Sequence, residues 1–234
     1  MSDAKTVHQV APDRAGAHAT IAAAIAAATD GDVIQVFPGE YHESLSIGKD
    51  IEISGVGSHE DIRIVADRDP AVTSFARVLI MKNLTLSCKQ RNQPVLLCKQ
   101  GNLDVRFLSL EGGKYGVAAE QGSRVTIADS YFGNAERGGI IAKGSHNVSV
   151  DNSLIERCGG SGLIAENCDE VRVTHSTFND TTPHAIESSG QGIFEVVDTE
   201  FTDIPHAPIL DNYHPIKFEE ERAWYTRKVP GANE

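Results

Sequence analysis

The chain has 234 residues, enough for one elongated domain, and its 40% hydrophobic content argues against a wholly disordered protein. Its net charge of −12 argues against a nucleic-acid or anionic-membrane partner, and no apolar stretch reaches the length of a membrane span. The 21 glycines and the aromatic content of only 6% suit a fold with many tight turns.

The first 15 residues are polar, and we expect residues 1–15 to form a flexible segment outside the folded core. No secretory signal is visible in this segment, so a cytoplasmic protein is expected. The cysteines have none of the spacings of a zinc site, and we expect them to be reduced core residues: Cys88, Cys98, Cys158 and Cys168. These patterns indicate neither a metal ion nor a cofactor.

A short helix is predicted for residues 18–29. Ile21 and Ile25 are four residues apart and so share one face, and Asp30-Gly31 is a typical stop signal. The residues that follow, 33–57, alternate in short strands separated by turns. A helix directly before a run of strands is well placed to cover the exposed end of a sheet.

A repeat of 23 residues dominates the second half of the chain. Apolar residues recur at this step in three rows: Val117, Ile140, Leu163, Ile186 and Ile209; Phe132, Ile155, Phe178 and Phe201; Val125, Val148, Val171 and Phe194. Within each unit the apolar residues alternate over short strands separated by polar turns. One such unit cannot bury its own apolar face, but stacking it on similar neighbours can. The sequence therefore predicts a solenoid whose coils lie about 4.8 Å apart.

These repeats resemble those of the pectin-lyase-like superfamily, in the variety called carbohydrate-binding and sugar-hydrolysis repeats. The motifs GDVIQV at 31–36 and PGEYHE at 38–43 are similar to the opening of that superfamily. The resemblance implies an all-β fold, a single-stranded right-handed parallel β-helix of about eight coils over residues 16–212, with a short N-terminal capping α-helix. It implies no single activity, because the superfamily includes lyases, hydrolases, esterases, epimerases and non-enzymatic scaffolds.

After Ile209 the repeat ends, and residues 213–234 are predicted to form a C-terminal tail. The tail carries the only tryptophan of the chain, Trp224, followed by Tyr225. Two alternative roles remain open for these side chains. They cover the last coil of their own chain, or they contact a partner subunit in a homo-oligomer.

Counting in steps of 23 aligns outward positions on neighbouring coils and yields two polar clusters. The first consists of Lys114, Tyr115, Glu120, Arg137 and Lys143. Its Tyr-Gly-Val stretch resembles the tyrosine-containing strand of alginate epimerases and lyases. The resemblance implies that Tyr115 handles a proton at C5 of a uronic acid while Lys and Arg side chains neutralise the carboxylate. The alternative is a surface ladder of weak ion pairs from Glu120 through Lys143 to Glu166.

The second cluster consists of His184, Glu187 and His206, with Asp211 and His214 nearby. His184-Ala185-Ile186 resembles the His-Gly-hydrophobic motif of polygalacturonases, but Ser161-Gly162-Leu163 on the preceding coil lacks their pair of aspartates. Inverting hydrolysis needs two carboxyl groups around a water molecule, so this type of glycosidase is not expected. A histidine beside a glutamate is suited to act as a general base, and it equally forms a hydrogen-bonded surface pair.

Two further rows are expected to be structural. They are Asp129, Asn152, His175 and Asp198, and beside them Ser130, Ser153, Ser176 and Thr199. Side chains of these types satisfy the backbone N–H groups of turns, so we expect ladders at a corner of the solenoid. The aligned rows contain no cluster of outward carboxylates that would suit calcium.

The first functional hypothesis is a carbohydrate-active lyase or epimerase/isomerase that abstracts a proton from an oligosaccharide or a small polar acid. The predicted catalytic residues are His184, Glu187, His206 and Tyr115. The predicted substrate-binding residues are Lys114, Arg137, Lys143, Glu120, Asp211 and His214. No metal and no cofactor are expected.

Two alternatives come from other classes. One is a non-enzymatic module that offers its flat strand face to a protein or glycan partner through an exposed apolar strip of Ile141, Ile164 and Leu210. The other is a self-assembling β-helix of the bactofilin kind. The irregular, proline-rich C-terminus argues against it, because such a segment would block end-to-end stacking.

Overall fold

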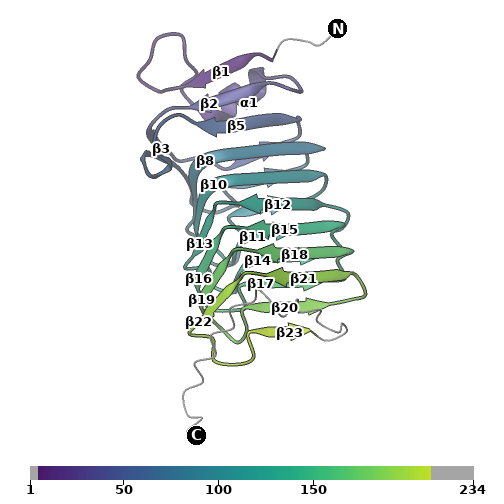
Figure 1. The fold of residues 1–234 in the computed structure, drawn as a ribbon. Coiled ribbons are helices and arrows are strands. Elements are labelled where there is room, and N and C mark those ends of the chain that lie inside the picture. The colour runs from purple at the N-terminus through teal and green to yellow at the C-terminus, as the bar shows by residue number, and fades with distance from the viewer. Residues whose placement is uncertain (1–4, 212–234) are drawn as a thin grey trace, which may run out of the picture.

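The computed structural model describes residues 5–211, which form a stack of short parallel strands (Figure 1). The strands belong to two sheets, sheet A with 15 strands and sheet B with 8, and neighbouring strands run parallel. Each coil after the first supplies strands to both sheets, so the strands of the inner coils bond to the coil above and to the coil below. The prediction of an all-β parallel β-helix is confirmed.

Sheet A bends at a corner and so covers two faces of each coil. Its first face has nine strands in succession, which gives about nine turns in place of the eight expected: β1 (Val7–Val10), β2 (Val33–Val36), β5 (Ile51–Gly55), β8 (Val78–Cys88), β10 (Asn102–Gly112), β12 (Arg124–Ala128), β15 (Asn147–Asp151), β18 (Glu170–Thr174) and β21 (Ile193–Val197). The second face includes β3 (Gly39–Tyr41), β6 (Ile62–Ala66), β13 (Tyr131–Gly133), β16 (Leu154–Cys158), β19 (Thr177–Thr181) and β22 (Glu200–Thr202). β8 and β10 are long enough to serve both faces.

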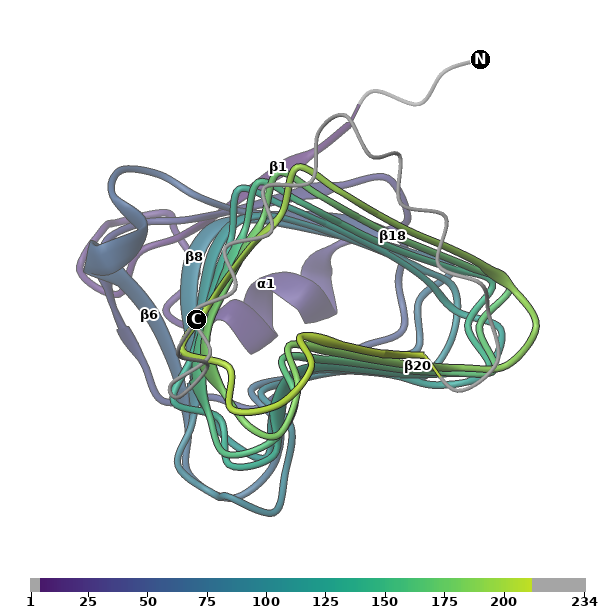
Figure 2. The same ribbon diagram turned by 60° about the horizontal axis from the view of Figure 1, so that its bottom comes forward.

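Sheet B forms the third face, on the far side of the core from β18 (Figure 2). Its strands in chain order are β4 (Leu45–Ile47), β7 (Val72–Ser74), β9 (Leu96–Cys98), β11 (Tyr115–Ala119), β14 (Gly138–Lys143), β17 (Leu163–Glu166), β20 (Ile186–Ser189) and β23 (Ile209–Asp211). In strand order they stack one on the next, so a residue before one strand lies beside its equivalents on neighbouring coils.

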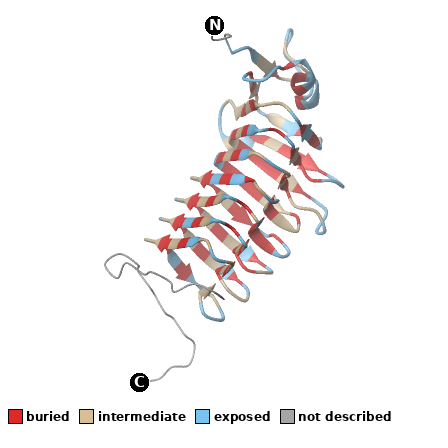
Figure 3. Ribbon diagram, turned by 90° about the vertical axis from the view of Figure 1, so that its right-hand side faces the viewer, coloured by how far each residue is buried: buried red, intermediate tan, exposed pale blue. Residues whose placement is uncertain are grey.

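The register of the strands follows the 23-residue step. Val117 pairs with Ile140, Ile140 with Leu163, and Leu163 with Ile186, and all four side chains are fully buried. Buried and more exposed residues alternate along the strands (Figure 3), as expected for strands with one face in a core. The predicted column of Phe132, Ile155 and Phe178 is likewise fully buried.

The corner of sheet A is a row of left-handed residues. The angle φ is 50° at Asp129, 43° at Asn152, 48° at His175 and 46° at Asp198. Asn and Asp tolerate this conformation better than most residues. Asn152 Nδ2 donates to Asp129 Oδ1 at 2.6 Å, and His175 Nδ1 lies 2.8 Å from Asp151 Oδ1. The side chains of this polar row, including that of His175, therefore form hydrogen bonds at the turn, which fits the structural role predicted for them.

A ladder of buried hydroxyls runs beside this corner. The N–H of Ser130 donates to Ser153 Oγ, and the N–H of Ser153 donates to Ser176 Oγ, each at 3.2 Å. Each hydroxyl in turn donates to the carbonyl two residues before it, at 2.7 to 2.8 Å. These side chains satisfy backbone groups that the bend would leave unpaired.

The prediction of a flexible segment over residues 1–15 is wrong for β1. Its four residues pair with β2 in register, from Val7 opposite Val33 to Val10 opposite Val36, and Val10 is fully buried. The four residues VHQV are too few to identify a strand from their sequence, and their side chains do not alternate between buried and exposed. The β-helix thus begins about ten residues earlier than expected.

Asp32 fixes this first strand to the next coil. Its carboxylate accepts the Thr29 N–H at 2.8 Å and the Thr6 N–H at 2.9 Å, and it lies 3.1 Å from His8 Nε2. The hydrogen bonds from Thr29, His8 and Thr6 stabilise the charged form and hold the pKa of Asp32 well below its usual range.

The helix α1 (Ile21–Ala27) lies across the N-terminal end of the core (Figure 2). It is shorter at both ends than the predicted 18–29. Thr20 Oγ1 accepts the Ala23 N–H at 3.1 Å and so caps the first turn. The carboxylate of Glu43 accepts the N–H groups of Ile21 and Ala22 at 2.8 and 2.9 Å.

The C-terminal end of α1 is capped by a side chain from β4's coil. Lys49 Nζ donates to the carbonyls of Ile25, Ala26 and Ala28 at 2.8, 2.9 and 2.6 Å. A cation at this end also interacts favourably with the helix dipole. One further helical turn, η1 (His59–Asp61), precedes β6.

All four cysteines are free and buried, as expected. Burial raises the pKa of each thiol, to about 11 at Cys98 and at Cys158. A thiol that stays protonated at neutral pH is a poor nucleophile, so these residues contribute packing rather than chemistry.

Candidate functional site

Four of the predicted site residues lie on the turns that lead into sheet B: Lys114, Arg137, His184 and His206. The others within the described residues lie in its strands (Tyr115, Lys143, Glu187 and Asp211) or directly after β11 (Glu120). Tyr115, at the start of β11, is paired with Gly138 at the start of β14. The N–H of Arg137 donates to the Lys114 carbonyl at 2.9 Å, so these two residues occupy equivalent places on consecutive coils. The adjacency that the 23-residue step predicted for Lys114 and Arg137 is therefore present.

The first cluster borders a pocket that was not predicted from the sequence. The pocket has a volume of about 380 Å³ and is lined by Gln90, Arg91, Asn92, Lys114, Glu136 and Arg137. Lys114 Nζ lies 5.4 Å from the centre of the Tyr115 ring, a cation–π distance. Among residues 5–211, none of the three pocket cations forms an ion pair.

Glu120 and Lys143 do not join this pocket. Lys143 Nζ lies 2.8 Å from Glu166 Oε2, whereas Glu120 Oε1 lies 2.5 Å from Lys99 Nζ on the preceding coil. The predicted ladder is thus correct for Lys143 and Glu166 and wrong for Glu120 and Lys143. Exposed ion pairs of this kind contribute little stability.

The second cluster is held together by a serine. The hydroxyl of Ser161 donates to the carboxylate of Glu187 and accepts the backbone N–H of His184 at 3.4 Å. Ser161 is only 1% exposed, so this hydroxyl is enclosed between two coils and positions the groups that contact it. Ser161 was not among the predicted site residues. The signal in the sequence that places it here is its position 23 residues, or one coil, before His184.

His184 is oriented by the turn that follows its coil. Its Nδ1 lies 2.7 Å from the Ala207 carbonyl, and its own carbonyl accepts the Thr181 hydroxyl at 3.0 Å. Because a carbonyl oxygen only accepts, Nδ1 must carry the hydrogen, and Nε2 of the neutral ring keeps its lone pair. The His206 ring lies 5.8 Å away, centre to centre. The structure therefore brings together His184, Glu187 and His206, as predicted, with Ser161 added.

One predicted member, Asp211, does not share the outer face with this cluster. Asp211 pairs with the buried Ser188, which places it in the core-facing column of sheet B and not on the outer face. The alternation along β23 explains this, since Ile209 also faces inward and Leu210 lies between them. His214 and the tail over 213–234 lie outside the described residues.

The predicted apolar strip on sheet B is interrupted. Ile141, Ile164, Glu187 and Leu210 stand in one column of the register, but Ile141 is only 8% exposed. Glu187 places a carboxylate between the remaining aliphatic side chains. The continuous exposed strip that would favour a protein-docking face is therefore absent from this column.

A third polar cluster lies on the second face of sheet A. The Tyr131 hydroxyl donates to Glu156 Oε1 at 3.1 Å and accepts from Arg157, and Arg157 also lies 2.5 Å from Glu156 Oε1. Burial and the bond to Glu156 raise the pKa of Tyr131. The three groups satisfy one another, which is typical of a structural network.

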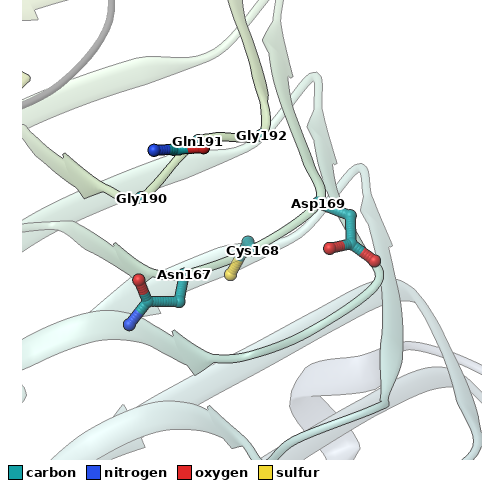
Figure 4. A pocket seen from close by; sticks show the side chains of 6 residues that line it. All are labelled: Asn167, Cys168, Asp169, Gly190, Gln191 and Gly192. Atoms are coloured by element: carbon teal, nitrogen blue, oxygen red, sulfur yellow. The ribbon is translucent and has the colours of Figure 1, made fainter.

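A second pocket, of about 480 Å³, lies between two turns on the opposite side of sheet B. Figure 4 shows Asn167, Cys168 and Asp169 on one turn and Gly190, Gln191 and Gly192 on the next. Asp169 is paired with His146 Nδ1 at 2.7 Å. No predicted site residue lines this pocket.

Within the described residues, no group of three or more His, Cys, Asp or Glu side chains is arranged to hold a metal ion. No helix over residues 5–211 is long and apolar enough to span a membrane.

Residues 85–220 match the protein family described as right handed beta helix region. Among solved structures, the deglycosylated pectin methylesterase from Aspergillus niger is similar, with a TM-score of 0.56 and 12% identity over 92% of this chain and 90% of that one. The Escherichia coli protein ybhc has a TM-score of 0.60 at 13% identity, covering 87% and 73% of the two chains. Pectate lyase Pel9A has a TM-score of 0.54 at 11% identity, covering 97% and 82%. At such identities the likeness shows a shared fold.

Proposed function

The chain belongs to the family of right-handed β-helix regions, and from that premise we propose that it is a carbohydrate-active enzyme that removes a proton from a glycan or a polyol-acid. The solved structures that share its fold include proteins named for pectin and pectate, which motivates a saccharide as the substrate class. The proposed reaction is a β-elimination or an epimerisation, both of which begin with abstraction of a proton next to a carboxylate.

The orientation of His184 carries this proposal. With Nδ1–H donated to the Ala207 carbonyl at 2.7 Å, Nε2 is the only ring atom able to accept a proton. A base must be held within hydrogen-bond reach of the proton it removes, and a fixed tautomer meets that need. The carboxylate of Glu187 is held by Ser161, which also accepts the backbone N–H of His184. The exposed ring of His206 lies 5.8 Å from that of His184, and we assign it the transfer of protons between His184 and solvent.

Tyr115 and the cations of the first cluster take a binding role in this proposal. Tyr115 begins β11 and His184 precedes β20, which are three strands apart in sheet B. At the usual strand spacing that separation is roughly 14 Å, too far for both to act on one bond. Lys114 and Arg137 then contact an anionic part of the ligand away from the reacting carbon.

The proposal places the protein in the cytoplasm. Its four free, buried cysteines fit a reducing compartment, where disulfides are rare.

The test is proton exchange in D₂O. The purified chain is incubated with uronic-acid and neutral oligosaccharides, and loss of the C–H signal next to the carboxylate is followed by NMR. We expect His184→Asn to slow exchange by about 10² to 10⁴, the usual contribution of a general base, with an unchanged melting temperature. His146→Asn, an exposed histidine paired with Asp169, is the matched control and should exchange at the wild-type rate.

A different outcome favours the non-enzymatic alternative. Ile164 and Leu210 remain partly exposed on the outer face of sheet B, which suits a binding module. If oligosaccharides raise the melting temperature but wild type catalyses neither exchange nor elimination, the enzyme proposal is wrong and a glycan-binding module remains.

A further inference from the structure

We infer that the pocket of Arg91, Lys114 and Arg137 anchors an anionic group of the ligand at a fixed distance from His184, and so selects acidic chains over single sugars. This inference deepens the proposed function and rests on it. It adds a charge requirement and a minimum length to a substrate class that the catalytic cluster alone does not specify.

The charge balance of the pocket is the first observation. The whole chain has a net charge of −12, yet this pocket combines three cations with one carboxylate, Glu136, and two neutral amides. Within the described residues the cations form no ion pairs, whereas most Lys and Arg side chains elsewhere do. Like charges that line one pocket repel one another, and a bound anion reduces that repulsion.

The side chains of the pocket cations, and not their backbone N–H groups, must bind the anionic group of the ligand. The N–H of Lys114 donates to the Gln93 carbonyl at 2.7 Å, and the N–H of Arg137 donates to the Lys114 carbonyl at 2.9 Å. Two guanidinium groups offer planar pairs of donors that match an oxyanion, and the ammonium of Lys114 adds a point charge. Carboxylate, sulfate and phosphate groups share this chemistry.

The coil spacing sets the length. Arg91, Lys114 and Arg137 precede β9, β11 and β14, and His184 precedes β20 in the same sheet. At about 4.8 Å per strand, the three cations lie roughly 19, 14 and 10 Å from His184 along the stack. A single acidic sugar cannot reach both places. A chain of about three units can, with its acidic group in the pocket and its reacting carbon at His184.

The experiment is titration calorimetry with uronate monomer, trimer and hexamer, neutral oligosaccharides of equal length, a sulfated trimer, and inorganic phosphate. We expect the acidic trimer and hexamer to bind at least tenfold more tightly than the monomer, phosphate and neutral chains. Arg91→Gln and Arg137→Gln should each lower the affinity for acidic oligomers about tenfold and leave the affinity for neutral oligomers unchanged. The uronate and sulfated trimers distinguish which anion the pocket prefers.

Arg124→Gln is the matched control. Arg124 is an exposed arginine at the start of β12 in sheet A, and it forms no ion pair within residues 5–211. If Arg124→Gln weakens the binding of acidic oligomers as much as Arg137→Gln does, a diffuse surface charge and not the pocket attracts the ligand, and the inference is overturned. Equal affinity for neutral and acidic chains, or for monomer and trimer, overturns it as well.

The two proposals fail separately. If exchange depends on His184 while the pocket variants bind every ligand as wild type does, the pocket inference is wrong and the proposed function stands. If acidic oligomers bind with the expected charge and length dependence but no proton exchanges, the pocket is supported and the enzyme proposal is wrong.

Discussion

Buried serines in this β-helix have different roles according to their place in the repeat. Ser130 belongs to the corner row of sheet A and donates to the Ala128 carbonyl at 2.7 Å. Ser161 lies in the turn before sheet B and donates to the carboxylate of Glu187. Residue type alone does not separate the two cases. The position within the 23-residue step does, because it decides whether the nearest acceptor is a backbone carbonyl or an outward side chain.

The sequence predicted the clusters better than their members. The step of 23 correctly placed Lys114 next to Arg137 and His184 near His206. The aligned rows of outward residues begin at Lys114, so they leave out the preceding coil with Arg91. On that coil the step is shorter, because Val117 pairs with Leu96, only 21 residues back.

Asp211 was misplaced for a different reason. The step of 23 puts it in the inward column of Ser188 and Ala165, so the error was in the face assigned to it and not in the register.

Asp32 provides a prediction about pH at the scale of one side chain. Hydrogen bonds from Thr29, His8 and Thr6 lower its pKa in the folded state. Its contribution to stability is therefore complete above the unfolded pKa of about 3.9 and is lost as the pH falls through the lower folded pKa. We expect Asp32→Asn to be less stable than wild type at pH 7, and the gap to narrow as the pH falls below about 4. Urea unfolding of both proteins at pH 7, 5 and 3 measures this difference in the free energy of unfolding.

The control for Asp32 is Asp13→Asn, at an exposed carboxylate in the turn after β1. This variant should match wild type at each pH. A gap between Asp32→Asn and wild type that stays constant from pH 7 to pH 3 would show that the loss comes from altered hydrogen-bond geometry and not from charge.

The helix α1 shows what can and cannot be predicted for one element. The spacing of Ile21 and Ile25 identified the helix and its buried face, and both side chains are buried against the first coils. Its N-terminal end depends on Glu43, which is 21 and 22 residues away from the two N–H groups that it accepts. Its C-terminal end depends on Lys49, which is 21 to 24 residues away from the three carbonyls that it contacts. Local stop signals such as Asp30-Gly31 carry no information about such partners.

Removing the cap at Lys49 tests the role of α1 as a cover for the core. Lys49→Met keeps the aliphatic stem but loses three hydrogen bonds to the last carbonyls of the helix. We expect a loss of about 1–2 kcal/mol in the free energy of unfolding, or roughly 2–8 °C in melting temperature. The control, Lys89→Met, removes an exposed ion pair with Asp67 and should cost no more than about 0.5 kcal/mol. Equal losses in the two variants would contradict a special role for Lys49.

In the whole molecule, each coil contacts only its neighbours in the stack, so local changes should remain partly local. The repeat was readable from the sequence because stacking forces equivalent residues into one column. The first strand, β1, was not, because it lies before the repeat begins and has only four residues. Fold prediction thus succeeds where the same physical requirement recurs and weakens where an element occurs once.

Gly139 offers a test of this near-neighbour behaviour in the centre of the solenoid. A Cβ atom at this position would lie 2.7 Å from Ile155 Cγ2 and 2.9 Å from the Gly162 carbonyl oxygen, so two coils would have to separate. We expect Gly139→Ala to lower the free energy of unfolding by about 1–3 kcal/mol, as overpacking of a core does. Gly48→Ala is the control, because a Cβ there meets nothing within 4 Å, and it should leave stability unchanged.

The cysteines show how far the damage from Gly139→Ala spreads. All four thiols are buried, so alkylation of the native protein needs local opening. Cys158 ends β16, next to the column that Gly139 disturbs, and Cys168 follows β17, the next strand of sheet B. We expect these two to react faster in the variant while Cys88 and Cys98 keep nearly their wild-type rates, as followed by mass spectrometry of peptides after timed labelling. An equal acceleration at all four cysteines would mean that the solenoid opens as one unit, and that coupling between coils extends over its whole length.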